Sequence, residues 1–166
     1  ATDVSLMNLV DRVAVPSHCA ANVIASVGVA RSRIAVVAHG VGDGSADLDL
    51  GDRAALRDME RARHAGLLVA ACVGTIGARK NQRVLVDAIR RMTGPRSVYC
   101  LFIGDGRAPD LLQAIDDAGL AGRVRVHGYS RAARRLAAGA DVLVLPSRSE
   151  GQPLAVLEAF CDGTLV

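Results

Sequence analysis

The sequence has very few aromatic residues. Its 166 residues include no tryptophan, two tyrosines and two phenylalanines, although 51% of all residues are hydrophobic. Proteins that bind single-stranded nucleic acid usually stack the bases on several exposed aromatic rings. The composition therefore argues against a nucleic-acid partner. The formal net charge of only +3 favours a small anionic ligand over a polyanion.

The cysteines show no pattern of a metal site or a disulfide framework. Cys19, Cys72, Cys100 and Cys161 are widely spaced, and no two of them form a C-x-x-C motif. Zinc sites and small disulfide-rich proteins usually have close, regular cysteine spacing. We therefore expect reduced, mostly buried thiols and no metal ion.

The sequence also lacks a long apolar run and a leader peptide. No stretch approaches the roughly 20 apolar residues of a membrane span. The first residues include Asp3 and Asp11 and lack the basic and apolar regions of a signal peptide. We expect a cytoplasmic location, with any membrane association arising through a domain that this sequence lacks.

Short apolar runs alternate with segments of helical periodicity. Runs rich in Val, Ile and Leu predict strands within residues 12–17, 33–40, 67–74, 97–104, 123–128 and 141–147. The helical segments are 52–65, 81–93, 108–118, 130–139 and 153–161. Continuous apolar strands that alternate with helices are typical of a parallel sheet with helices on both faces. The sequence therefore predicts an α/β protein with a Rossmann-like parallel sheet.

Ligands of such sheets bind where the loops after the strands meet helix N-termini. One of these loops, 104–109, begins with G-x-G, but Pro109 stands where a dinucleotide fingerprint has its third glycine, so NAD is a minor alternative. Asp47 and Asp49 form a D-x-D motif that could hold a metal with a nucleotide diphosphate. They lie in the Gly-rich segment 39–52, the best linker candidate, and we expect a solvated acidic turn there.

The segment 146–161 carries the most informative pattern. Pro153 suits the first position of a helix and Ser149 can cap it, so backbone N–H groups from Gly151 to about Leu154 would point outward. Together with the helix dipole, such groups form an anion site. The helix that follows is apolar nearly all round, and we expect it to be buried.

Two glutamates accompany this anion site. Glu150 and Glu158 would lie about 12 Å apart if helical rise is assumed. One carboxylate could accept hydrogen bonds from the vicinal hydroxyls of a ribose, while the other meets the far end of the same ligand and a diphosphate lies between them. In the alternative, Glu158 forms an ion pair with an arginine of another helix, because an unpaired buried carboxylate is costly.

Four segments resemble a known family. They are VGTIGARKNQRVLVDAI, FIGDGRAPDLL, RVRVHGY and, above all, DVLVLPSRSEGQPLAVLEAF. They are similar to the donor-binding domain of retaining glycosyltransferases with the GT-B fold, the glycosyltransferase group-1 family. The resemblance implies that residues 1–32 are a remnant of the preceding acceptor-side domain and its linker. Residues 33–166 would form the nucleotide-sugar-binding domain, truncated at its C-terminus.

The resemblance also implies an activity. The donor would be a UDP- or GDP-linked sugar, transferred as a hexose with retention of configuration and without a metal or other cofactor. The acceptor would be a saccharide, a lipid-linked sugar or a small molecule, bound mainly by the missing domain, so we expect the fragment alone to be inactive. The alternatives are a noncatalytic nucleotide- or sugar-binding module and a nucleotide-sugar epimerase or phosphorylase of the same fold.

The residues with which the family contacts the sugar and the ribose match the segment 150–158 of this sequence. By resemblance, Glu158 would bind the ribose hydroxyls, and Glu150 would contact the transferring sugar near the reaction centre. Gly151 and Gln152 would add polar contacts to the sugar, and the backbone of Leu154 would meet the diphosphate.

The other implied contacts come from two further loops. Lys80 matches the family's phosphate-binding lysine, whose charge would stabilise the leaving diphosphate, so Lys80 and Glu150 are the candidate catalytic residues. Thr75 stands where many relatives carry an arginine, and Arg79 is the expected substitute. Tyr129 falls where the backbone of the family recognises the base.

Overall fold

A computed structural model describes residues 4–92, 97–106 and 109–166, and the predicted helix ends at 93 and 108 lie outside these ranges. Contacts divide the chain into two compact units. The first unit runs to Val41 and includes Glu150–Leu154. The second unit consists of Gly42–Ser149 and Ala155–Val166. Each unit is described by itself.

The first unit contains a small two-stranded parallel sheet. Its elements are α1 (Val4–Met7), β1 (Val13–Val15), α2 (His18–Ser26), a 3-10 turn (Arg31–Arg33) and β2 (Ile34–Val36). Strand β2 pairs with β1, with Val13 opposite Ile34, and takes no part in the larger sheet. The contacts therefore divide the chain after Val41, inside the Gly-rich segment 39–52, whereas the sequence places the domain boundary between residues 32 and 33.

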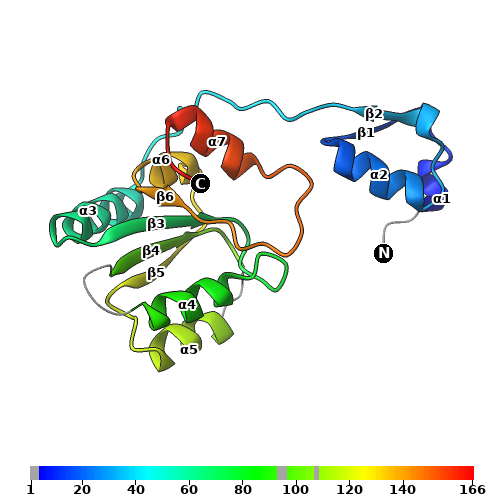
Figure 1. Cartoon of the computed structure of the whole chain (residues 1–166). Coiled ribbons are helices and arrows are strands. Elements are labelled where there is room, and N and C mark those ends of the chain that lie inside the picture. The colour runs from blue at the N-terminus through cyan, green and yellow to red at the C-terminus, as the bar shows by residue number, and fades with distance from the viewer. Residues whose placement is uncertain (1–3, 93–96, 107–108) are drawn as a thin grey trace. The chain divides into compact units, whose positions relative to one another are not determined.

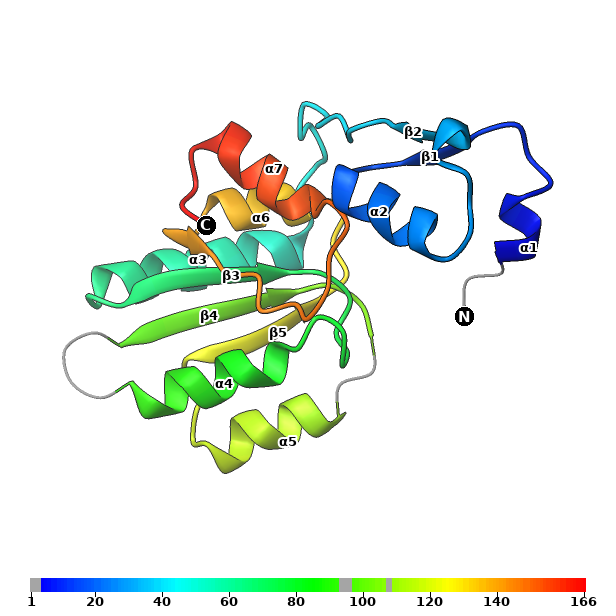
Figure 2. The same ribbon diagram turned by 45° about the vertical axis from the view of Figure 1, so that its right-hand side comes forward.

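The second unit is a four-stranded parallel sheet in the order β5-β4-β3-β6 (Figure 1). Its strands are β3 (Leu68–Val73), β4 (Val98–Ile103), β5 (Val124–Gly128) and β6 (Val142–Leu143). Helices α3 (Leu50–His64), α6 (Ala133–Ala138) and α7 (Leu154–Asp162) cover one face, and α4 (Gln82–Arg91) and α5 (Pro109–Asp117) cover the other (Figures 1 and 2). The predicted Rossmann-like α/β sheet is confirmed.

The buried faces of the sheet explain its continuous apolar strands. Every residue of β4 is buried, because the strand is paired on both edges and covered on both faces. On one face, Leu101 and Ile103 pack with Met59 of α3 and Leu136 of α6. On the other face, Phe102 belongs to the core cluster formed with α4 and α5. Alternation along a strand sends successive side chains into the two cores.

The acidic D-x-D motif has a local structural role. The side chain of Asp49 accepts a hydrogen bond from the Asp52 N–H at 2.7 Å, and the Asp49 N–H donates to Asp52 Oδ2 at 3.0 Å. This reciprocal pair is a capping box, which satisfies free N–H groups at the start of α3. The prediction of a solvated turn therefore holds for exposed Asp47, whereas Asp49 caps a helix that begins at Leu50.

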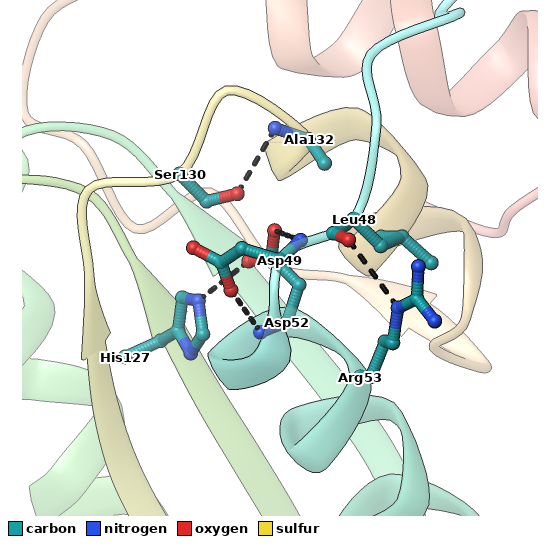
Figure 3. Close-up of polar contacts among 7 residues, drawn as sticks. All are labelled: Leu48, Asp49, Asp52, Arg53, His127, Ser130 and Ala132. Carbon is teal, nitrogen blue, oxygen red and sulfur yellow. Dashed lines mark hydrogen bonds and ion pairs between the residues drawn. The ribbon is translucent and has the colours of Figure 1, made fainter.

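A buried Asp–His pair joins α3 to the end of β5. Asp52 Oδ1 lies 2.8 Å from His127 Nε2, and less than a tenth of either side chain is exposed (Figure 3). Burial opposes the ionisation of Asp52. Hydrogen bonds from the Asp49 backbone, the Ser130 hydroxyl and the His127 ring outweigh burial and hold the pKa of Asp52 below its usual value. The pair therefore fixes the loop after β5 onto the first turn of α3.

The prediction of reduced, mostly buried cysteines is confirmed only in part. Cys72 on β3 and Cys100 on β4 are buried free thiols, and burial raises the pKa of Cys72 to about 12. Cys19 and Cys161 are exposed free thiols. The expectation of mostly buried thiols is therefore wrong for these two, because they lie on outward faces of α2 and α7.

We predict that Asp52→Asn lowers the free energy of unfolding by about 1.5–3 kcal/mol at neutral pH, the usual value of hydrogen bonds to a charged group. Because the folded-state pKa of Asp52 is lowered, its stabilisation is present above the usual pKa and is lost as the pH falls through the folded value. In urea unfolding, the difference in the free energy of unfolding between the wild type and Asp52→Asn should therefore become smaller as the pH falls. Asp87→Asn, which removes a half-buried carboxylate that pairs with Arg83, is the matched control. A difference that stays constant with pH would show that the ionised Asp52 carboxylate does not supply this stability.

Candidate functional site

The carboxyl ends of three neighbouring strands approach one another closely. A glycine with positive φ follows β3 and β4 directly, namely Gly74 and Gly104, and β5 ends at a third one, Gly128. A Cβ atom on Gly104 would lie 2.2 Å from the carbonyl oxygen of Gly74, so any side chain there would collide with backbone. The Gly104 N–H instead donates to the Gly128 carbonyl at 2.8 Å. Glycine is required at Gly104 because only backbone fits between the strand ends.

Lys80 lies across the end of β3. A Cβ atom on Gly74 would lie 2.9 Å from Lys80 Cε and 3.2 Å from Nζ, so the lysine side chain occupies the space that a residue larger than glycine would fill. The charge of Lys80 also acts on buried Cys72 of β3. Lys80 is the only lysine of the sequence, and every other Lys or Arg position is an arginine. Sequence reasoning did not use this count, which singles out the residue.

The side chain of Gln82 ties together the loop before α4. Its Oε1 accepts a hydrogen bond from the Gly77 N–H at 3.2 Å, and its Nε2 donates to the carbonyls of Thr75 at 3.1 Å and Gly74 at 3.5 Å. Gln82 is buried, with 3% of its surface exposed. Sequence reasoning missed it. The signal was a glutamine at the first position of the buried i, i+4, i+7 face of α4, which continues with Val86 and Ile89.

The loop after β3 also contacts the loop after β6. The Arg148 N–H donates to the Arg79 carbonyl at 2.9 Å, and Arg79 Nη1 donates to the Ser149 carbonyl at 3.2 Å. Asn81, with a left-handed φ of 56°, donates from Nδ2 to the Pro146 carbonyl at 3.3 Å. The structure thus brings Arg79 and Lys80 to the carboxyl edge of the sheet, beside the loop that precedes Glu150.

Glu158 on α7 lines a pocket of about 240 Å³. The pocket walls are the segment 42–46 and the residues Arg131–Arg135 at the start of α6. A larger pocket of about 550 Å³ lies beside β5 and α3 and contains none of the predicted site residues. The smaller pocket therefore matters more for the predicted chemistry, because it holds a candidate ligand group.

The Glu158 carboxylate has no hydrogen bond or ion pair within the described ranges of the chain. Arg134 of α6 faces it, but the Arg134 guanidinium is paired with Asp162 through bonds of 2.8 and 2.7 Å. The alternative prediction, an ion pair between Glu158 and an arginine of another helix, is therefore wrong for Arg134. Burial raises the pKa of Glu158, the charge of Arg134 opposes this, and that of Asp162 adds to it.

Helix α7 is less buried than its sequence predicts. Ala159 is its only buried residue, and Ala155 and Val156 pack beside it on the core. Leu154 is 45% exposed and Phe160 is 66% exposed. The prediction of a buried helix is wrong because only one side of α7 packs on the sheet. Pro153 directly precedes the first helical residue, one position earlier than predicted.

The remaining predicted residues are divided between the two units. Tyr129 follows β5 in the second unit and is exposed. Glu150, Gly151, Gln152 and Leu154 belong to the first unit. There, Gln152 Oε1 accepts a hydrogen bond from the His39 N–H at 2.8 Å. That the two sets of residues bind one ligand stays a prediction.

The profile of a family described as "Glycosyl transferases group 1" matches residues 68–166, more than half of the chain. The chain belongs to this family. LpsE, a lipopolysaccharide core biosynthesis glycosyltransferase of Rhizobium meliloti (strain 1021), is 35% identical over 95 residues, which cover 57% of this chain and 27% of LpsE. The family match agrees with the predicted resemblance.

Two solved structures share the fold of this chain. HepE of Anabaena, in complex with UDP and glucose, superposes with a TM-score of 0.81 at 21% identity, over 97% of this chain and 45% of HepE. The apo form of WaaB, a lipopolysaccharide outer core galactosyltransferase, gives a TM-score of 0.70 at 21% identity, over 99% of this chain and 44% of WaaB. These neighbours support the predicted GT-B fold, and the chain spans less than half their length.

Two further properties of the described residues concern other classes of site. No helix in these ranges is long and apolar enough to span a membrane. No group of three or more His, Cys, Asp or Glu side chains in them is placed to hold a metal ion.

We predict that Gln82→Leu lowers the free energy of unfolding by about 1–3 kcal/mol, because it leaves the Gly77 N–H and the Thr75 carbonyl without their partner. Urea unfolding measures this loss. Gln113→Leu is the matched control, since Gln113 is exposed on α5 and bonds only to Asp117. Equal stability of the two variants would show that Gln82 does not hold the loop.

Proposed function

We propose that this chain is the donor-binding part of a retaining glycosyltransferase that uses a UDP- or GDP-linked hexose. The observation that carries the proposal is the Glu158 carboxylate, which lines a pocket and has no partner among the described residues. A carboxylate that accepts no protein hydrogen bond can accept two from the vicinal hydroxyls of a ribose. The HepE structures with UDP and with UDP-glucose support this choice of ligand.

Lys80 supplies the charge that the reaction needs. Breaking the bond between the sugar and the diphosphate leaves negative charge on the diphosphate. An ammonium group held beside that position stabilises the charge as it develops, without a metal ion or other cofactor. The end of the Lys80 side chain lies beside Gly74, and Gln82 ties together the loop that carries this lysine. Arg79 is the second candidate for a phosphate contact.

The other roles follow the same proposal. The backbone at Tyr129 contacts the base, and that of Leu154 contacts the diphosphate. Glu150 contacts the transferring sugar near the reaction centre, with Gly151 and Gln152 beside it. Nothing in the chain favours the epimerase, the phosphorylase or the noncatalytic module over a transferase. The acceptor is a saccharide, a lipid-linked sugar or a small molecule, and the complete enzyme acts in the cytoplasm.

We predict that UDP or GDP raises the melting temperature of this chain more than NAD does, because one lysine and one ribose-binding glutamate select a compact nucleotide diphosphate. UDP should also protect Lys80, the only lysine, from an amine-specific acylating reagent, as read by peptide mass spectrometry. Lys80→Ala should remove most of the shift, and Arg91→Gln, an exposed change on α4, should keep it. An equal shift with NAD, or acylation that UDP does not slow, would overturn the assignment.

We also predict that the two glutamates respond to different ligands. Glu158→Ala should weaken the binding of both UDP and UDP-glucose by about tenfold or more, since a hydrogen bond to a charged acceptor contributes roughly 1.5–3 kcal/mol. Glu150→Ala should weaken chiefly UDP-glucose, because UDP lacks the sugar. Calorimetry measures both, with exposed Glu60→Ala as control. If Glu158→Ala destabilises the fold and leaves nucleotide affinity intact, Glu158 does not bind the ribose.

A further inference from the structure

Arg134 joins three parts of the wall around Glu158. The residue lies on α6, and its guanidinium makes two hydrogen bonds to Asp162 at the end of α7, at 2.8 and 2.7 Å. Its Nη1 also donates to the carbonyl oxygen of Gly42. Only 16% of the Arg134 side chain is exposed. One planar guanidinium thus connects α6, α7 and the segment that precedes α3.

The segment 42–46 lies directly on this arginine. A Cβ atom on Gly44 would lie 3.1 Å from Arg134 Cδ, and Gly44 has a φ of 71°, so a larger residue would be both strained and crowded. The neighbouring Arg135 donates from Nη1 to the carbonyl of Ala46 at 3.1 Å. Since the segment 42–46 contains no helix or strand, these two arginines supply side-chain contacts that hold it against the pocket.

The charges around Glu158 make Arg134 more than a structural link. Asp162 lies one helical turn after Glu158 on α7, so two carboxylates face the same side of the helix. Arg134 bonds to Asp162 and acts on Glu158 through its charge. Arg131 and Arg135 line the same pocket, and Asp43 of the segment 42–46 interacts with Arg134. Burial raises the pKa of Glu158, Arg134 opposes the rise, and Asp162 reinforces it.

We propose that Arg134 is a positioning residue for the nucleotide, which holds the segment 42–46 and the end of α7 around the pocket so that Glu158 meets the ribose as a carboxylate. The inference rests on the proposed function, because it assumes that Glu158 binds the ribose. Arg134 itself touches neither the sugar nor the diphosphate. It neutralises Asp162, which would otherwise repel a second carboxylate in the same pocket.

This role has a consequence that a purely structural role lacks. Without Arg134, Glu158 and Asp162 lose the cation between them, and the pKa of Glu158 rises further. A protonated carboxyl group accepts fewer hydrogen bonds from ribose hydroxyls than a carboxylate does. Nucleotide binding by a variant without this charge should therefore fail at a higher pH than binding by the wild type.

The test is calorimetry with UDP on the whole chain, for the wild type, Arg134→Gln, Arg134→Lys and the control Arg91→Gln. Between about pH 8 and about pH 5, Arg134→Gln should lose roughly tenfold more affinity than the wild type, because its Glu158 takes up a proton at higher pH and then accepts fewer hydrogen bonds. Comparison with the wild type removes the titration of the UDP phosphate itself. Arg134→Lys, which keeps the charge and loses the planar fork, should follow the wild-type pH profile at lower affinity.

Three results would overturn parts of the scheme, and they are distinguishable. Wild-type affinity and pH profile in Arg134→Gln would end the inference and leave the proposed function standing. If Arg134→Gln binds UDP more weakly at every pH but keeps the wild-type pH profile, Arg134 is only a structural link, and the inference is also wrong. No UDP binding by the wild type would remove the proposed function, and the ribose role with it.

A second measurement does not depend on UDP. Carbon-13 NMR of the glutamate carboxyl groups reports the ionisation of Glu158 directly, and Glu158→Gln assigns its signal. A higher Glu158 pKa in Arg134→Gln than in the wild type supports the electrostatic part of the inference, and an unchanged one contradicts it. If Arg134→Gln does not fold, Arg134→Lys gives the comparison, because it keeps the charge and should leave the Glu158 pKa near that of the wild type.

Discussion

The site depends on how closely the strand ends approach one another. Because a Cβ on Gly104 would lie 2.2 Å from the Gly74 carbonyl, the ends of β3 and β4 can meet only as bare backbone. This approach lets the loop after β4 meet the loop after β3, where the Ile76 N–H donates to the Asp105 carbonyl at 2.7 Å. The loop after β3 in turn carries Lys80 across Gly74. A steric constraint on backbone thus places the one lysine of the chain at the carboxyl edge.

Polar side chains hold the remaining parts of this edge. Gln82 bonds the loop after β3, Asp52 and His127 fix the loop after β5, and Arg134 holds the segment before α3. Asp52 and Gln82 are buried, and hydrogen bonds of buried groups are costly to lose, so the loops that they hold have one strongly preferred arrangement. Glu158 differs from these residues, because it lies among them with no such bond in the described part of the chain. A group that folding leaves unused is available to a ligand.

The strands and the sheet could be predicted because they depend on continuous apolar runs, and all six predicted strands appear. The strand with which residues 34–36 pair could not be predicted. A short strand of Ile, Ala and Val fits either sheet, and its tertiary contacts determine which sheet it joins. The exposed side of α7 was missed for a similar reason, because composition does not say how many faces of a helix are covered. Lys80 was predicted from the family resemblance. Glu158 was predicted from its place on an apolar helix, and the resemblance implied its ribose role. Gln82 and Arg134 were found only from the contacts of the structure.

The division of the chain into two units separates its proposed binding residues into two groups. Lys80, Arg79, Tyr129 and Glu158 belong to the unit with the larger core, whereas Glu150 and its neighbours belong to the unit with the two-stranded sheet. Only five residues, 150–154, leave the larger unit and return to it. The proposed separation of ribose and sugar recognition between Glu158 and Glu150 agrees with this division, because the two glutamates belong to different units although only seven residues lie between them in the chain.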